Sequence, residues 1–307
     1  MSIHQYILKR VLMMLPVLLA VTIIVFSILH LVPGDPVHLA LGEMASQQAY
    51  DRMRAKLGLD KPLHIQYFSF LGRLFHLNLG KSIIYRENVA ELLAAKLPNT
   101  LELTGSALLL SYFFAVPLGM LAAVKRNTVI DYLSMGLAIA GVSVPSFWLG
   151  FLLISFFSIQ LHWFPIAGYG GIKYLVLPAV TLGFGGAAQV ARMTRSSLLE
   201  VINQDYILTA KAKGLRYWTV ITKHALRNAL IPIVTLLGLR VGWLIGGAVV
   251  IEIVFLRPGL GRLLVTAIYM RDFPVVQGAT LILAVIVVRG VPLADVLYAV
   301  VNPKVHY

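Results

Sequence analysis

Gly80-Lys81-Ser82 is the tripeptide in this sequence that could end a phosphate-binding loop. Such a loop needs another glycine five positions before Gly80, because backbone N–H groups of the glycine-rich turn hold the phosphates. Phe75 occupies that position. The sequence therefore predicts no nucleotide site in this chain. Any ATP-driven step would need an ATPase on another polypeptide.

Other residue types that could support catalysis or bind a metal are scattered along the chain. The eight histidines contain no His-Glu-x-x-His pattern, and His30 and His38, which flank a turn, are a weak pair of metal ligands. Neither a nucleophile elbow nor a pair of neighbouring carboxylates occurs. The absence of cysteine excludes disulfides and thiolate metal sites. We therefore predict that the chain is not an enzyme and holds no metal.

Basic residues gather in the interval 192–232, the only long polar stretch in the second half of the chain. Its charged residues are Arg192, Arg195, Lys211, Lys213, Arg216, Lys223 and Arg227, with Glu200 and Asp205. Apolar residues recur at helical spacing, at Leu199, Ile202 and Tyr206, then at Leu215, Trp218, Thr222 and Ala225. Gly214 lies between these runs, where a helix commonly ends in the left-handed conformation. The interval predicts two short amphipathic helices joined by a glycine turn.

A hairpin of this kind between membrane spans would offer a surface to another protein. A basic loop between spans can equally do no more than fix the orientation of the neighbouring helices. The order of residues distinguishes these interpretations. The segments DYILTAKAKG (205–214) and KHALRNALIP (223–232) resemble the cytoplasmic loop of ABC importer permeases, in the variant typical of dipeptide, oligopeptide and nickel uptake systems.

The general family pattern is Glu-Ala-Ala, three residues, Gly, nine residues, then Ile-x-Leu-Pro. Ala210, Gly214 and Leu226 match it, whereas the peptide-type variant accounts for the departures at Leu208, Thr209, His224 and Arg227. In the family this loop holds the coupling helix, which docks in a groove of an ATPase subunit. The coupling residues that the resemblance implies are Asp205, Tyr206, Thr209, Ala210, Lys211, Ala212, Lys213, Gly214, Leu215, Trp218, His224, Ala225, Leu226, Arg227 and Asn228.

Three further segments carry the same resemblance: LVPGDP (31–36), LGLDKP (57–62) and LNLGKS (77–82). In the family they mark the N-terminal extension of one of two paired permeases. The resemblance implies an all-α polytopic membrane protein with the six transmembrane helices of the type I importer permease fold and a small external helical segment. It also implies a homologous second permease, two ABC ATPase subunits that use ATP and Mg, and a periplasmic or lipid-anchored solute-binding protein. No cofactor is expected on this chain itself.

Composition independently indicates a polytopic membrane protein, because 59% of the 307 residues are hydrophobic and the mean hydropathy is +0.83. The formal net charge of +13 would suit a nucleic-acid partner. However, the basic residues lie beside apolar spans, where membrane topology and contact with anionic lipids explain them better. We therefore expect membrane lipids as partners and no nucleic acid.

The predicted organisation begins with a transmembrane helix over 1–31. Lys9 and Arg10 precede an apolar run that is too long for a signal peptide and lacks a cleavage site. An external helical segment follows over 32–98, then a core permease domain over 99–301 with five transmembrane helices and the coupling loop 192–232, and a cytoplasmic tail over 302–307. Both termini are then cytoplasmic in a bacterial inner membrane. The five core spans are expected at 101–124, 129–159, 174–190, 229–255 and 274–301.

The external segment opens with a turn at Pro33, Gly34 and Pro36. A helix is predicted over 46–57, with Ser46 as its N-cap and Gly58 as its end. A second helix follows Pro62 and is expected to lie on the outer membrane surface. The third span, 129–159, is too long for a straight crossing, and Gly141 and Pro145 predict its break.

Arg240 lies ten residues past Leu230, and therefore roughly 15 Å into the fifth span. A charge at that depth is costly, so Arg240 is expected to face a cavity or a partner. One hypothesis places it on the translocation path, where it attracts a carboxylate of the solute. The alternative is an ion pair with an acid such as Glu102, or with the partner permease. The peptide-type family usually has Gln here, which suggests a cavity-facing site.

Two other charged positions lie within predicted spans. Glu252, near the outer end of the fifth span, is a candidate gate or a structural hydrogen-bond acceptor, and the family commonly has Glu here too. Arg289-Gly290-Val291-Pro292 interrupts the sixth span, where the family usually continues an apolar run. Arg289 is expected to extend to the cytoplasmic face or to pair with Asp295.

These observations predict an ATP-driven ABC importer permease that forms half of the translocation path for peptides or similar small solutes. The same architecture could import nickel chelates or glutathione-like solutes, because WFPIAGYGG (163–171) is somewhat similar to nickel-type members. An ion-gradient-driven secondary transporter is an alternative of a different class. It would predict internal repeats and a relay of buried acids, neither of which is evident.

Overall fold

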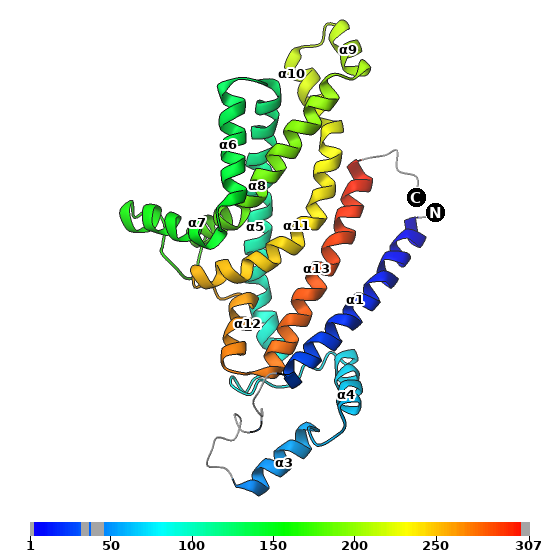
Figure 1. The fold of residues 1–307 in the computed structure, drawn as a ribbon, viewed down its shortest axis with the longest axis vertical. Helices are drawn as coiled ribbons and strands as arrows, with labels where there is room; N and C mark the ends of the chain where they lie inside the picture. The colour runs from blue at the N-terminus through cyan, green and yellow to red at the C-terminus, as the bar shows by residue number, and fades with distance from the viewer. Residues whose placement is uncertain (1–2, 32–36, 38–45, 302–307) are drawn as a thin grey trace. The chain divides into compact units, whose positions relative to one another are not determined.

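The computed structural model describes residues 3–31, 37 and 46–301, and the regular elements in this part of the chain are helices (Figure 1). They are α1 (Ile3–Leu31), α3 (Gln47–Leu57), α4 (Leu63–Phe75), α5 (Val89–Val124), α6 (Val129–Ser143), α7 (Ser146–Leu153), α8 (Lys173–Ile202), α9 (Asp205–Ala212), α10 (Tyr217–Thr219), α11 (Leu226–Val254), α12 (Leu260–Tyr269) and α13 (Phe273–Val301), with π-helical segments η1 (Ile154–Gln160) and η2 (Val220–Ala225). The turn predicted at 33–36 and the tail 302–307 lie outside the described residues.

The chain folds as two units. The first contains the described residues of 1–7, 100–257 and 287–307, and the second contains those of 8–99 and 258–286. Among the described residues, four helices are long and apolar enough to cross a membrane: Val89–Val124, Lys173–Ile202, Tyr217–Val254 and Phe273–Gly290. The predicted first span is the 29-residue helix α1, which includes the apolar stretch Leu12–Ser27.

The third predicted span is broken where the sequence indicated. Helix α6 ends at Ser143 and α7 begins at Ser146, and the two arms are bent by 108°. Pro145 explains the break, because a proline disfavours helical backbone in the preceding residue. Val144 is accordingly extended, with φ −83° and ψ 123°. Counted as one span, this bent pair is a fifth candidate crossing.

In the second unit, both predicted helices of the 46–75 region are present. The hydroxyl of Ser46 accepts a hydrogen bond from the N–H of Ala49 at 3.4 Å, and Gly58 ends α3 at φ 70°. Helix α4 packs on α1, with Tyr67 hydroxyl 2.8 Å from Thr22 Oγ1 and its ring against Phe26. At least one side of the amphipathic helix α4 therefore packs on α1.

Helix α5 begins at Val89, twelve residues before the predicted start of the second span. The extension is explained by packing within the second unit, where Val89, Leu92 and Leu93 are buried in one cluster with residues of α12 and α13. The turn between α12 and α13 is fixed by the buried carboxylate of Asp272. It accepts hydrogen bonds from the hydroxyl of Ser82 and from the N–H groups of residues 83 and 84.

In the first unit, α8 is the helix against which α6, α7 and α11 pack. Helix α5 also crosses α8 very closely. A Cβ added at Gly119 would lie only 2.4 Å from the carbonyl oxygen of Ala191, and one at Gly183 only 2.6 Å from that of Ala107. Glycine is therefore required at these two positions because a backbone oxygen occupies the space a side chain would need.

The sequence predicted that Arg289–Pro292 interrupts the sixth span. This prediction is wrong, since α13 runs continuously from Phe273 to Val301. Gly290 has a packing role instead: a Cβ there would lie 2.8 Å from Val241 of α11. The side chain of Arg289 is exposed, and the side chain of Asp295, its predicted partner, lies outside the described part of the chain.

Gly119→Ala is expected to lower the free energy of unfolding by about 1–3 kcal/mol, because the added methyl group overpacks the α5–α8 crossing. Gly105→Ala on the same helix is the matched control, since nothing lies within 4 Å of the added Cβ. It should be neutral or stabilising by about 0.5–1 kcal/mol. Thermal unfolding of the purified variants measures both. Equal effects would contradict the close crossing.

Candidate functional site

The interval 205–225 forms a helical hairpin between α8 and α11. Helix α9 ends at Ala212, and Gly214 takes the left-handed conformation with φ 73°. The chain then re-enters helix at Tyr217 and continues through η2 into α11 without a loop. The predicted pair of helices with a glycine turn is confirmed. The second of them is the first part of a long membrane helix.

The hairpin has a buried face that attaches it to the first unit. Ile207 and Ala210 of α9 are buried in one cluster with Val220, Ile221 and Ala225 of the second arm. This cluster also contains Leu198 of α8 and Ala123 of α5. The Nδ2 of Asn228 donates a hydrogen bond to the hydroxyl of Tyr206 at 2.7 Å, which joins the two arms.

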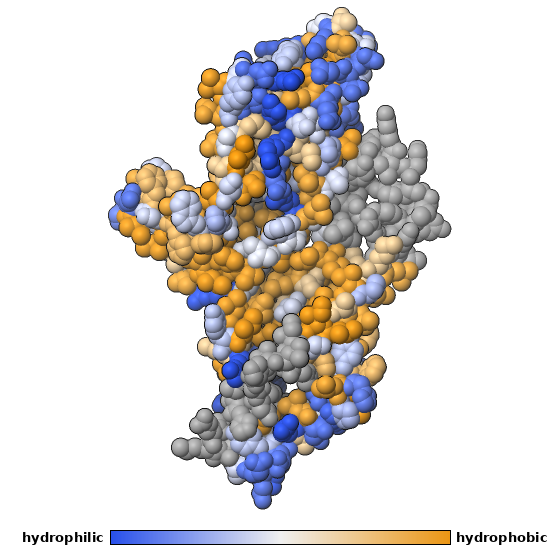
Figure 2. Space-filling model, in the orientation of Figure 1, coloured by the Kyte–Doolittle hydropathy of each residue, from blue (hydrophilic) through white to orange (hydrophobic). Residues whose placement is uncertain are grey.

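The opposite face of the hairpin is exposed and both aromatic and basic. Leu208, Leu215, Tyr217 and Trp218 are exposed large hydrophobic residues. The surrounding exposed cations are Lys211, Lys213, Arg216, Lys223 and Arg227. Figure 2 shows hydrophilic residues gathered over α9 and α10, whereas mostly hydrophobic residues cover α7. Exposed aromatic residues among cations are typical of a protein-binding surface, in which aromatic residues and Arg are enriched.

Of the residues predicted for coupling, most lie on this exposed face. Ala210 and Ala225 instead belong to the buried face, and His224 and Leu226 are half-buried. Sequence reasoning missed Ile207, Val220 and Ile221, which anchor the hairpin. In the first arm the buried positions begin at Ile207, one residue after the predicted Tyr206. In the second arm Ile221 precedes the predicted Thr222 by one residue, and Ala225 was predicted correctly.

A partly buried ion pair lies where α8 approaches the hairpin. Arg195 of α8 donates from Nε and Nη2 to the two oxygens of Asp131 in α6, at 2.6 and 2.7 Å. The Asp131 side chain is only 3% exposed, and it also accepts a hydrogen bond from the N–H of Asn127 at 3.0 Å. This bidentate contact, which sequence reasoning missed, fixes α6 to α8 seven residues before α8 ends.

A cavity of about 690 Å³ lies among α6, α7, α8 and α11. Its lining is rich in glycine and contains one charged residue, Arg240. The lining residues include Gly141, Gly185, Gly186, Gly238, Gly242, Gly246, Gly247, Thr181, Ser146, Trp243 and Arg240. Arg240 is the central residue of α11, fourteen residues from either end. Its predicted position at mid-span and beside a cavity agrees with this geometry.

The guanidinium of Arg240 donates a hydrogen bond from Nη2 to the side-chain oxygen of Gln189 on α8. It reaches α8 over Gly186, where a Cβ would lie 3.6 Å from Nη1. The ion pair between Arg240 and Glu102 that was considered as an alternative does not form, because Glu102 is bonded to Arg257. Gln189 was not predicted, since a polar residue on a long helix gives no sign of its partner.

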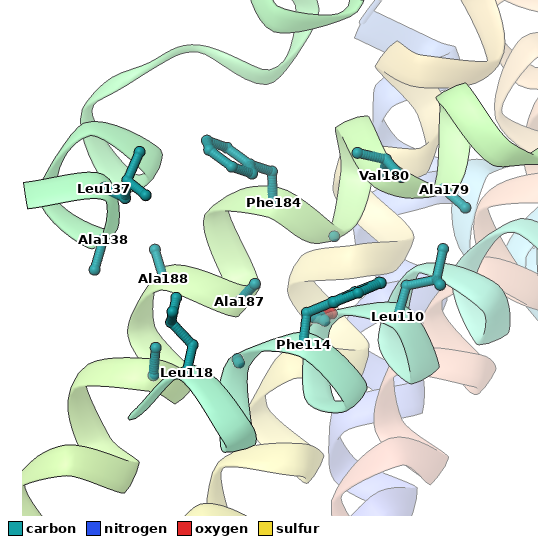
Figure 3. A pocket seen from close by; sticks show the side chains of 14 residues that line it. Leu110, Phe114, Leu118, Leu137, Ala138, Ala179, Val180, Phe184, Ala187 and Ala188 are labelled. Atoms are coloured by element: carbon teal, nitrogen blue, oxygen red, sulfur yellow. The ribbon is translucent and has the colours of Figure 1, made fainter. Parts of the chain in front are cut away.

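A smaller cavity of about 280 Å³ lies between α5, α6 and α8. Figure 3 shows Leu137 and Ala138 of α6 on one side of it and Leu110 and Phe114 of α5 on the other. Its one polar side chain, Ser111, donates to the carbonyl of Ala107 in its own helix. The lining therefore offers little to orient a polar solute, in contrast to the cavity beside Arg240.

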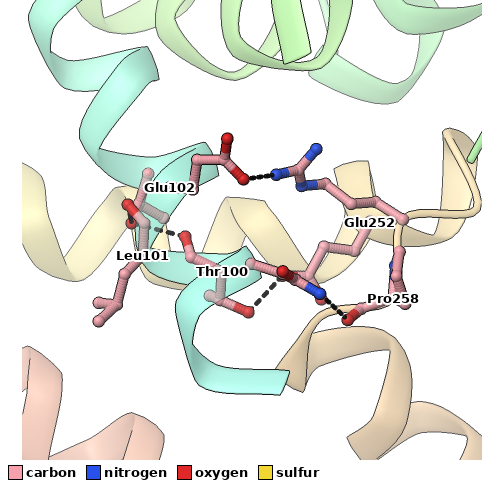
Figure 4. Close-up of polar contacts among 8 residues, drawn as sticks. Thr100, Leu101, Glu102, Glu252 and Pro258 are labelled. Carbon is pink, nitrogen blue, oxygen red and sulfur yellow. Dashed lines mark hydrogen bonds and ion pairs between the residues drawn. The ribbon is translucent and has the colours of Figure 1, made fainter. Parts of the chain in front are cut away.

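Glu252 is fully buried at the end of α11 and accepts a hydrogen bond from the hydroxyl of Thr100 at 2.6 Å (Figure 4). Its backbone carbonyl accepts from the N–H of Arg257 at 2.8 Å. These contacts favour the role of Glu252 as a structural hydrogen-bond acceptor over its role as a gate. Arg257 is also buried, bonds Glu102 and lies with its guanidinium carbon 5.0 Å from the ring centre of Tyr169. This cluster attaches the loop after η1 to α5 and α11.

Among the described residues, no group of three or more His, Asp or Glu side chains could hold a metal ion. His38 lies outside the described residues, and so does the side chain of His30.

Apolar helices around a cavity that contains an arginine at mid-helix are typical of a polytopic membrane protein of the transport class. Comparison with known families gives the particular group. The family model described as the inner membrane component of binding-protein-dependent transport systems matches residues 115–307, and the model of its N-terminal part matches 3–104. The chain belongs to this family of ABC importer permeases, in its peptide, oligopeptide and nickel branch.

Relatives match over the whole length. The glutathione transport system permease protein GsiC of Salmonella paratyphi A is 43% identical over 303 residues, which is 99% of each chain. The GsiC protein of Escherichia coli K12 is 42% identical over the same coverage. The solved MetNI methionine ABC transporter in inward-facing form is similar in fold, with a TM-score of 0.57 and 24% identity over 69% of this chain and 96% of that chain. The chain therefore has the type I importer permease fold.

Asp131→Asn is expected to lower the free energy of unfolding by about 1.5–3 kcal/mol, because it removes the charge from two hydrogen bonds to Arg195. The double variant Asp131→Leu/Arg195→Met should lose less free energy of unfolding than the single variants Asp131→Leu and Arg195→Met lose together. The reason is that the double variant leaves neither charge without its partner. Glu200→Gln, an exposed acid on α8, is the control, with an expected change within about 0.5 kcal/mol. Thermal unfolding of the purified chain gives the comparison, and additive losses would contradict the pair.

Proposed function

We propose that this permease imports small peptides, glutathione among them, across a bacterial plasma membrane, with both termini on the cytoplasmic side. One observation carries the proposal: α8 and α11 line the cavity that contains Arg240, and the same two helices hold the exposed hairpin. The cavity volume lies in the range of about 300–1,000 Å³ that small-molecule sites occupy. The 43% identity to a glutathione permease over 99% of the chain supports the substrate class.

The proposed assembly pairs this chain with a homologous second permease that completes the path. Two ABC ATPase subunits use ATP and Mg, and one of them docks on the hairpin of this chain. A periplasmic or lipid-anchored binding protein delivers the solute. In this assembly the chain has no catalytic role. Its tasks are to bind and release the solute and to receive movement from the ATPases.

Coupling follows from how the hairpin is built. Its buried face packs on α8 and on the end of α5, so a force on the exposed face reaches the membrane helices through packed side chains. The second arm passes through η2 into α11 without a flexible loop. Closure of the ATPases would therefore shift α8 and α11 and change access to the cavity. The same proposal includes a core permease domain that begins near residue 99 and a place for Arg240 on the translocation path.

The test of this assembly is purification of the tagged chain in mild detergent from membranes that contain its neighbours. Partners are identified by mass, and the eluate is assayed for ATP hydrolysis. Recovery of a second permease and of ATPase subunits supports the proposal. Recovery of this chain alone or with itself would favour a gradient-driven carrier.

Trp218→Ala should weaken retention of the ATPase subunits by roughly fivefold or more, because a large aromatic side chain in an interface commonly contributes over about 1 kcal/mol. The side chain is 43% exposed on the hairpin. Trp163→Ala is the matched control: it removes an exposed tryptophan from the loop after η1 and should leave ATPase retention unchanged. Densitometry of the co-purified subunits measures the ratio.

Gly214→Pro tests the turn itself. Proline fixes φ near about −65°, which is incompatible with the positive φ at this position. We expect ATP-driven uptake to be lost while the second permease still co-purifies. Normal uptake by this variant would show that the geometry of the turn is not needed for coupling.

A further inference from the structure

We propose that Arg240 and Gln189 form a subsite that holds a carboxylate of the transported solute, so that the importer prefers small anionic peptides to neutral ones. The inference rests on the proposed function and goes further, because it names the chemical group recognised and the residues that recognise it. Its evidence is the position, the charge balance and the donor geometry of Arg240.

The position of Arg240 is that of a binding residue. It lines a cavity of about 690 Å³ at the midpoint of α11, between two helices whose facing residues are largely glycine. Glycines on both walls leave the guanidinium accessible from the cavity, since no side chain projects beside it at Gly186 or Gly242. A solute in this cavity would therefore meet the cation directly.

Among the described side chains, no acid is bonded to Arg240. No acid occurs among the residues that line the cavity. Four acids with described side chains lie in the membrane helices of the first unit. Glu200 is exposed near the end of α8, and the other three have other partners. Glu102 bonds Arg257, Asp131 bonds Arg195, and Glu252 accepts from Thr100. The described bond of Arg240 is to the neutral amide of Gln189. A positive charge in a low-dielectric cavity attracts an anion strongly, so a solute carboxylate is its natural complement.

The geometry of the pair suits a carboxylate. A guanidinium has five N–H donors in a planar fork, and Gln189 accepts one of them through its side-chain oxygen. The remaining donors match the two oxygens of a carboxylate. The amide nitrogen of Gln189 keeps two hydrogens that can donate to the same group. Gln189 thus orients Arg240 without neutralising it.

The test measures binding to the purified importer of two permeases and two ATPases, without nucleotide and without the binding protein, whose own specificity would otherwise enter. Radiolabelled glutathione is displaced by unlabelled glutathione or by glutathione diethyl ester, in which both carboxylates are esterified. Wild type should prefer the acid by about tenfold or more, the range expected for hydrogen bonds to a charged group. Equal displacement by acid and ester would overturn the proposal, as would the absence of glutathione binding.

Variants assign the preference to the two residues. Arg240→Gln should reduce the acid-to-ester ratio to near one, whereas Arg240→Lys should keep part of it, since the charge remains but the fork is lost. Gln189→Glu keeps Arg240 and adds an internal carboxylate beside it, and this should also abolish the preference. Arg289→Gln is the control, because it removes an exposed arginine from α13 that does not line the cavity. An unchanged ratio in Arg240→Gln or Gln189→Glu overturns the proposal.

Uptake by the reconstituted importer with its binding protein tests the proposed function separately. An importer that accumulates glutathione but binds acid and ester equally would overturn the carboxylate subsite and leave the function standing. An importer that prefers the acid but accumulates no peptide would overturn the function and leave the subsite standing.

Discussion

The first unit depends on one electrostatic constraint: a charge within membrane helices must have a partner, because insertion of an unpaired charge at the helix centre costs at least about 2.5 kcal/mol. Asp131 with Arg195 and Glu102 with Arg257 meet this constraint inside the chain. Both pairs join segments that are far apart in the sequence, and so they also fix the fold. Arg240 meets the constraint only through a neutral amide. Arg240 therefore differs from Arg195 and Arg257, whose charges are neutralised by acids within the chain.

Close helix crossings explain how such charges can be brought together. Gly119 and Gly183 let α5 lie with its backbone against α8, and Gly290 lets α13 pass Val241 of α11. Association of helices in lipid relies on this kind of contact, because burial of apolar surface gives no net advantage there. Two of the glycines that line the cavity have a different consequence: an added Cβ would meet nothing within 4 Å at Gly246 and nothing closer than 3.6 Å at Gly186. One residue type therefore serves both to close the helix bundle and to keep the cavity open.

Features governed by local backbone preference could be predicted from the sequence. The cap at Ser46, the helix end at Gly58, the break before Pro145 and the turn at Gly214 all follow from the conformations these residues favour. Features governed by distant contacts could not. The early start of α5 needs α12 and α13, the continuity of α13 needs a neighbour that accepts Gly290, and the partners of Arg240 and Asp131 lie 51 and 64 residues away. A single sequence carries no record of such pairs.

Helix α8 connects recognition with coupling. Gln189 and Arg195 are six residues apart on it, or roughly 9 Å along the helix axis. The first orients Arg240 and the second fixes α6 beside the hairpin. A shift of the hairpin that moves α8 relative to α11 must therefore change the distance between Gln189 and Arg240. The carboxylate subsite would then have different affinities in the two states of the importer. Linkage is reciprocal, so the hairpin and the anion would affect one another by the same free energy. The free energy by which a shift of the hairpin changes anion binding equals the free energy by which a bound anion changes the position of the hairpin.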